Sequence, residues 1–140
     1  MSPRNEGRTS KCDHDQARTR MTHANKFLDV AELVATDADS ESGATSVAAA
    51  LAVLAGIAAS DAACCAKLGR RSRGQDHRQA INLVRQVSPG GAEAATNLSQ
   101  LLDLKDTARY GVIHVTAVEL KTAIRRAKGI VKFAEASLRA

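Results

Sequence analysis

The sequence predicts an all-α protein, an antiparallel bundle of four to five helices in up-down topology. Apolar residues recur at spacings of three and four along most of the chain, which places them on one face of a helix. No stretch shows the sustained alternation of apolar and polar residues that is typical of a strand. Aromatic residues make up only 2% of the chain, so the core must consist of Ala, Leu, Val and Ile. Such small side chains suit closely approaching helices better than a sheet.

The chain has 140 residues, which fits one domain of ordinary size. Residues 1–20 are polar, of mixed charge and without an apolar period. We therefore expect a disordered polar tail over 1–20 and a helical bundle domain over 21–140. The first helix is expected over about 22–36, where an apolar stripe includes Phe27, Leu28 and Val34.

The second predicted helix is the most apolar segment. Thr45 or Ser46 is expected to cap it, and Gly69 lies where a left-handed C-cap is expected. Its apolar stretch is long enough to raise the question of a membrane, but it is Ala-dominated and contains Ser60 and Asp61. We therefore expect a central core helix and no membrane partner.

Three further helices follow. A third is expected to start at Asp76, because 76–79 fits the Asp variant of the capping box. A fourth is expected over about 91–108. The last helix has the clearest start, because Thr116 precedes Glu119 by three positions, as in a capping box. Its apolar stripe continues almost to the C-terminus, so we expect that end to be docked.

The cysteine pattern favours a reducing compartment. Cys64 and Cys65 are adjacent in the predicted core helix and have no CxxC partner, so we interpret them as small buried hydrophobic residues. Structural zinc needs about four convergent ligands, and neither a metal site nor a cofactor is predicted. The N-terminus lacks the apolar segment of a signal peptide. The expected location is the cytoplasm.

The chain is basic, with a net charge of +5, and one short segment is rich in arginine. This segment lies between two predicted helices, and the helix start behind it adds backbone N–H donors that favour an anion. A phosphate of RNA or of a nucleotide fits such a site; the alternative is a solvated loop whose arginines pair with surface carboxylates. His77, in the first helical turn, is interpreted as architectural. The arginines of the segment are Arg70, Arg71 and Arg73, and Arg78 lies just beyond it in the next predicted helix.

The last predicted helix carries a second basic feature. Four cations at spacings of four, three and four form one stripe along its polar side. Such a stripe suits nucleic acid or an acidic partner, and a plain solvated helix face has the same pattern. Few aromatic rings are present for stacking on bases, so contacts to nucleic acid should be mostly to phosphate. The four are Lys121, Arg125, Lys128 and Lys132.

Arg109 and His114 form an Arg-x4-His pair that suits metal-independent RNA cleavage. The histidine can move a proton to or from the reacting oxygens, and the arginine can stabilise charge on the phosphorane. The spacing is not specific by itself, because the chain has 20 Lys and Arg residues and 4 His.

The layout of these features resembles the HEPN family (higher eukaryote and prokaryote nucleotide-binding domains). The resemblance covers about 22–139. It is carried by the long Ala-rich helix with its Gly-Arg-Arg-Ser-Arg-Gly-Gln-Asp-His turn, by Leu-Leu-Asp-Leu-Lys-Asp at 101–106, and by Ala-Arg-Tyr-Gly at 108–111, followed by a capped last helix. It implies a helical bundle that is often a homodimer.

Two branches of this family set the functional expectations. Many bacterial members pair with a small nucleotidyltransferase in toxin–antitoxin modules, and others are metal-independent ribonucleases that use Arg-x4-6-His at the dimer interface. Arg109 and His114 match the catalytic layout, but Tyr110 replaces its usual polar residue, and the Ala-Arg-Tyr-Gly form is closer to the non-catalytic branch. The resemblance therefore favours a non-enzymatic binding protein that docks on a partner protein or nucleic acid. A ribonuclease toxin and a structural or regulatory helical protein are the alternatives.

Overall fold

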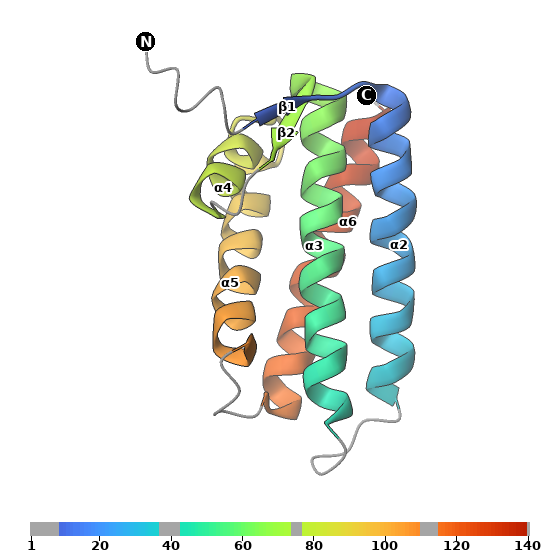
Figure 1. Cartoon of the computed structure of the whole chain (residues 1–140), viewed down its shortest axis with the longest axis vertical. Coiled ribbons are helices and arrows are strands. Elements are labelled where there is room, and N and C mark those ends of the chain that lie inside the picture. The colour runs from blue at the N-terminus through green and yellow to red at the C-terminus, as the bar shows by residue number, and fades with distance from the viewer. Residues whose placement is uncertain (1–8, 37–42, 74–76, 110–114, 140) are drawn as a thin grey trace.

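The computed structural model describes residues 9–36, 43–73, 77–109 and 115–139, and at 106–109 it describes the backbone alone. The described residues form five helices and one two-stranded sheet, which confirms the all-α bundle (Figure 1). Their order is β1 (Thr9–Lys11), α2 (His14–Thr36), α3 (Ala44–Leu68), β2 (Arg70–Ser72), α4 (His77–Arg85), α5 (Gly91–Arg109) and α6 (Ala117–Arg139).

The four long helices alternate in direction, and α3 is the central one. It packs against α2, α6 and α5, while the short helix α4 lies against α5 near the end of the bundle that carries β1 and β2 (Figure 1). By length and composition α3 could cross a membrane, yet 67% of its most apolar window is buried inside the bundle. It is thus the central core helix that the sequence predicts.

Small residues let the helices around α3 approach closely. Most of the alanines along α3 are fully buried, and larger core side chains come from the neighbouring helices, including Leu98 and Leu101 of α5 and Ile130 of α6. Gly56 marks one such close approach, because a Cβ atom there would lie 2.6 Å from Leu101 Cδ1. The small-residue core expected from the composition is therefore present.

The N-terminal region differs from the prediction. Residues 9–20 were expected to be part of a disordered tail, but they form β1 and the first turns of α2, which begins at His14 rather than near 22. Asp13 caps this start: Asp13 Oδ1 accepts the Gln16 N–H at 2.8 Å, and Gln16 Oε1 accepts the Asp13 N–H at 2.9 Å. The reciprocal pair is a capping box that satisfies two helix-terminal donors. Residues 1–8 lie outside the described residues.

Other helix ends follow the sequence more closely. Thr116 and Glu119 form the predicted capping box, with the Thr116 N–H donating to Glu119 Oε1 at 2.9 Å. Gly69 adopts the predicted left-handed conformation after α3 (φ 72°), and Gly43, rather than Thr45 or Ser46, is the N-cap of α3. Asp76, the predicted start of the third helix, lies outside the described residues; α4 begins at His77.

Candidate anion-binding end of the bundle

The first part of the arginine-rich segment is a strand, where the sequence suggested a loop. Gly69 turns the chain out of α3, and Arg70–Ser72 then form β2, which pairs antiparallel with β1. This pairing brings Lys11 of β1 beside the arginines. We call Lys11, Arg70, Arg71 and Arg73 the basic end of the bundle.

The strand register places two cations face to face. Lys11 lies directly opposite Arg70, and Ser10 lies opposite Arg71. Directly opposed residues of an antiparallel pair point to the same side of the ribbon, so Lys11 and Arg70 share a face. Like charges in this position repel each other. An anion between them would remove that repulsion and accept hydrogen bonds from both side chains.

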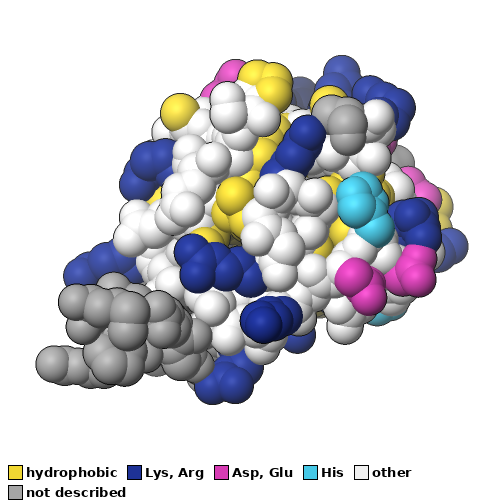
Figure 2. All heavy atoms as spheres, turned by 90° about the horizontal axis from the view of Figure 1, so that it is seen from above, with side chains coloured by type: hydrophobic (Ala, Val, Ile, Leu, Met, Phe, Trp, Pro, Cys, Tyr) yellow, Lys and Arg dark blue, Asp and Glu magenta, His cyan; other side chains and the backbone are white. Residues whose placement is uncertain are grey.

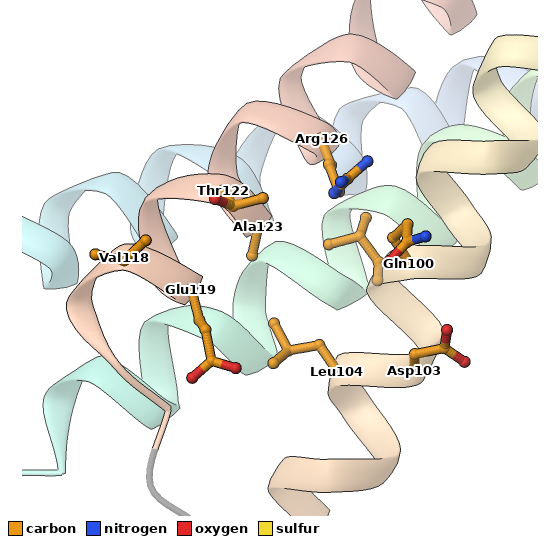
Figure 3. A pocket seen from close by; sticks show the side chains of 9 residues that line it. Gln100, Asp103, Leu104, Val118, Glu119, Thr122, Ala123 and Arg126 are labelled. Carbon is orange, nitrogen blue, oxygen red and sulfur yellow. The ribbon is translucent and has the colours of Figure 1, made fainter.

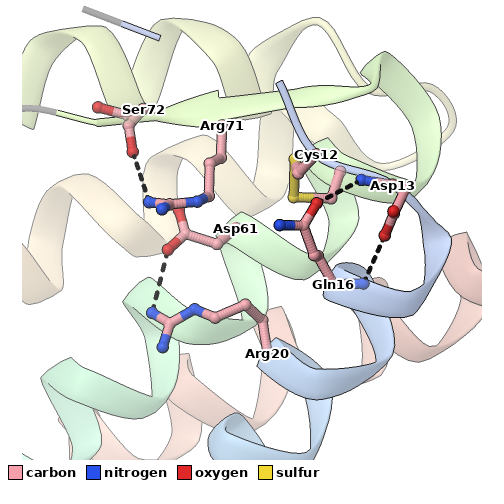
Figure 4. The surroundings of a disulfide bond; sticks show 8 residues. Cys12, Asp13, Gln16, Arg20, Asp61, Arg71 and Ser72 are labelled. Atoms are coloured by element: carbon pink, nitrogen blue, oxygen red, sulfur yellow. Dashed lines mark hydrogen bonds and ion pairs between the residues drawn. A yellow bond between two sulfur atoms is a disulfide. The ribbon is translucent and has the colours of Figure 1, made fainter. Parts of the chain in front are cut away.

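Arg71 belongs to a different set of contacts (Figure 4). Its guanidinium donates to the backbone carbonyl of Ser72 at 3.3 Å and lies near the carboxylate of Asp61 on α3. Asp61 in turn accepts a hydrogen bond from Arg20 of α2 at 3.0 Å. The charge of Asp61 is therefore shared between Arg20 and Arg71, whereas Lys11 and Arg70 have no carboxylate partner among the described residues.

Burial and charge oppose each other at Asp61, whose side chain is 13% exposed. Desolvation by burial raises the pKa of this carboxyl above 3.8, and the neighbouring Arg20 and Arg71 offset only part of that rise. Burial disfavours the charged form of a carboxyl, while a nearby cation favours it. The raised pKa shows that burial is the stronger of the two effects here.

A disulfide lies beside this network and corrects the interpretation of the cysteines. Cys12, which follows β1, is bonded to Cys65 of α3 (Figure 4). Cys65 is thus not a simple buried thiol, although Cys64 is one. Burial, together with the nearby charge of Asp61, raises the pKa of Cys64 to about 12, so this thiol stays protonated at neutral pH.

The other predicted site residues are not all brought together. Arg78 is exposed on α4, whose first residue is His77. Arg109 is the last residue of α5, but its side chain and the whole of His114 lie outside what the structure describes. The proposed catalytic pair therefore stays a prediction.

The basic stripe of α6 is exposed along its whole length, as expected for Lys121, Arg125, Lys128 and Lys132. One of its charges is compensated, because the Lys128 amine lies 3.3 Å from the Glu32 carboxylate of α2. A view onto the end of the bundle that carries β1 and β2 shows several separate groups of Lys and Arg side chains, with Asp and Glu side chains gathered on the right of the view (Figure 2). Positive charge is therefore present both at the basic end and along α6.

Two grooves lie away from the basic end. One, of about 310 Å³, separates α5 from α6; its apolar floor includes Leu104 and Ala123, and its rim carries Asp103, Glu119 and Arg126 (Figure 3). The rim groups take part in structural contacts: for example, Arg126 donates to Asn97 Oδ1 at 3.3 Å, and Glu119 belongs to the capping box.

The second groove, of about 370 Å³, lies between α3 and α5 and is more apolar. Its lining includes Val47 and Leu54, which are 55% and 41% exposed. Exposed apolar surfaces of this kind suit coverage by another protein.

Comparison with known protein families, curated proteins and solved structures finds no match. The described residues contain no group of three or more His, Cys, Asp or Glu side chains placed to hold a metal ion. Sequence reasoning missed Lys11, Cys12, Arg20 and Asp61 as parts of the site. Their partners are distant in sequence, and no local motif marks them.

Proposed function

We propose that this protein is a HEPN-like helical binding protein that binds nucleic-acid phosphate through its basic end. The observation that carries the proposal is the strand register that holds Lys11 opposite Arg70 on one face of the ribbon. Two cations held in repulsion are stabilised by a bound anion, and the ribbon fixes their positions before the anion arrives. Preorganisation of this kind lowers the entropy cost of binding.

The proposed ligand follows from the residues available. The chain has no Trp, one Tyr and two Phe, so it has little to stack on bases. Lysine and arginine contacts to phosphate do not depend on the base sequence of the nucleic acid, and they weaken as the salt concentration rises. RNA and DNA hairpins of the same sequence should therefore bind with similar affinity and with a steep dependence on salt.

Fluorescence anisotropy with a labelled RNA hairpin at two salt concentrations tests the proposal. The double variant Lys11→Glu/Arg70→Glu should bind at least about tenfold more weakly at low salt, because two phosphate contacts are replaced by repulsion. The matched control is Lys121→Glu/Arg125→Glu, which changes the net charge equally on the exposed face of α6. If the control loses as much affinity or more, the basic end is not the binding site.

The apolar groove between α3 and α5 favours a second role, docking on a partner protein. In the non-catalytic HEPN branch the partner is a small nucleotidyltransferase, and we propose the same class of partner here. Co-expression with a small nucleotidyltransferase tests it directly. Replacing Leu54 with Glu in the exposed groove should abolish co-purification, whereas Lys121→Glu should leave it intact.

A further inference from the structure

β1 is held to the bundle by one covalent bond and a small set of hydrogen bonds. Cys12, directly after β1, is bonded to Cys65, and its N–H donates to the Gly69 carbonyl at 3.0 Å. Each strand of the ribbon has only three residues. Short two-stranded ribbons are marginally stable in water by themselves. The disulfide therefore contributes much of the stability that keeps β1 on β2.

The helix that follows is anchored independently of the disulfide. The capping box of Asp13 and Gln16 closes its first turn, and Ala17 and Met21 are buried against the bundle. Cutting the disulfide should consequently free β1 and leave α2 in place. Because α2 then holds Cys12 close to Cys65, the bond can form again, and the two states can interconvert.

We infer that the Cys12–Cys65 disulfide is a reversible redox latch that holds Lys11 opposite Arg70 and thereby sets the affinity of the basic end for nucleic-acid phosphate. The inference rests on the proposed function. In a reducing cytoplasm, which the sequence predicts, disulfides are usually transient or redox-sensing; in an oxidising compartment the same bond would be permanent.

Opening the latch requires an external dithiol. A thiolate of the dithiol attacks the Cys12 sulfur, because Cys12 is half-buried while Cys65 is only 3% exposed. The Cys12–Cys65 bond breaks, a mixed disulfide forms on Cys12, and the Cys65 thiolate leaves and takes up a proton. The second thiol of the reductant then displaces Cys12, which is protonated in turn. The protein gains two electrons and two protons, and the dithiol becomes a disulfide.

Cys64 does not take part in this exchange. It is adjacent to Cys65 in sequence, but it is 2% exposed, and thiols without thiolate character are poor nucleophiles. Once the latch is open, the repulsion between Lys11 and Arg70 favours separation of the strands. Phosphate then loses the Lys11 contact, so the reduced protein should bind nucleic acid more weakly than the oxidised protein.

The state of the latch can be measured without any nucleic acid. Labelling with maleimide under denaturing conditions should modify one of the three cysteines in the untreated protein and all three after dithiothreitol. Hydrogen exchange of amides at 9–12 and 70–72 should accelerate on reduction, while amides in the middle of α2 stay protected. Three free thiols in protein purified without reductant, or unchanged exchange on reduction, would overturn the inference.

Binding of the RNA hairpin with and without dithiothreitol tests the consequence. Reduction should weaken binding roughly threefold to tenfold, as expected for loss of about one phosphate contact. Cys12→Ser should bind like the reduced protein in both conditions, and the matched control Cys64→Ser should respond to dithiothreitol like the wild type. If the hairpin binds in neither redox state, both the proposed function and the control of binding by the redox latch are wrong. If the hairpin binds equally well in both states, only the control of binding by the latch is wrong.

Discussion

Arg20 of α2 donates to the carboxylate of Asp61 on α3 at 3.0 Å, and this pair joins the two helices beneath the basic end. The contact does not make Asp61 an ordinary ion-paired carboxylate. Its pKa is raised, because burial of the charge outweighs the attraction of Arg20 and Arg71. Folding therefore favours the protonated form of Asp61, which gives its contribution to stability a pH dependence opposite to that of most paired carboxylates.

Replacing Asp61 with Asn should reveal this dependence. A carboxyl whose pKa is raised on folding contributes stability below its unfolded pKa and loses it as the pH rises through the folded pKa. The free energy of unfolding of the wild type, minus that of Asp61→Asn, should therefore fall as the pH rises above about 4, the ordinary pKa of an aspartate. Urea unfolding at several pH values measures the difference. A difference that grows with pH would show that the ion pair outweighs burial.

The helices could be predicted because their signals are local. The capping box of Thr116 and Glu119 and the C-cap at Gly69 each depend on a few consecutive residues, and the structure shows both. β1 could not be predicted in this way. A strand of three polar residues, Thr9–Lys11, has no measurable alternation, and it is ordered by its pairing with β2 and by the disulfide beside it.

Only part of the candidate site could be predicted from the sequence, because the other part depends on residues that are distant along the chain. The arginines of β2 form a local cluster, and their density alone marks them as a candidate anion site. Asp61 lies near Arg71 and shares its charge with it, whereas Arg70 lies opposite Lys11 and has a second cation as its neighbour. Lys11 and Asp61 reach β2 only through the tertiary fold. The separation of 53 residues between Cys12 and Cys65 likewise hides their pairing, because three cysteines allow several connectivities.

Gly56 should resist replacement by alanine, although alanine favours helices by about 1 kcal/mol. A new Cβ would lie 2.6 Å from Leu101 Cδ1, and Leu101 is itself fully buried. Overpacking of this kind costs about 1–3 kcal/mol, so after the gain in helix propensity a net loss of up to about 2 kcal/mol is expected in urea unfolding. Gly129→Ala is the control, because its Cβ would meet only the side-chain amide of Asn97, at 3.1 Å. Stability of that variant should be unchanged or slightly higher.

Reduction of the disulfide should destabilise the fold as well as free β1. The bond joins residues 53 apart, and chain-entropy arguments give about 4 kcal/mol as the stabilisation from closing such a loop. Urea unfolding with and without dithiothreitol measures the effect. Cys65→Ser has no disulfide to reduce, so its unfolding midpoint should be the same with and without the reductant. Cys64→Ala should keep the full response. Equal midpoints for the oxidised and reduced wild type would show that the bond constrains nothing in the unfolded chain.

The capping box at the start of α6 should contribute measurably to the free energy of unfolding. Thr116→Ala removes the hydroxyl that accepts the Glu119 N–H at 3.1 Å, and loss of an N-cap side chain typically costs about 1 kcal/mol. Thr96→Ala is a suitable control, because this exposed hydroxyl bonds to the Ala92 carbonyl within its own helix and caps no helix end. Thermal unfolding should separate the two variants, with the control within about 0.5 kcal/mol of the wild type.

Purified protein should not cleave RNA, in keeping with the non-enzymatic proposal. Tyr110 replaces the polar residue typical of catalytic Arg-x4-His motifs, and α6 begins only at Ala117, beyond His114 in the sequence. Incubation of a structured RNA with the protein in EDTA, followed by gel analysis, provides the measurement, with His114→Ala as the matched variant. Removing a histidine that acts as general acid or base should lower the rate of cleavage about 100-fold or more. Cleavage by the wild type that is lost in His114→Ala would therefore establish the ribonuclease alternative, whereas equal traces of cleavage in both would indicate a contaminant.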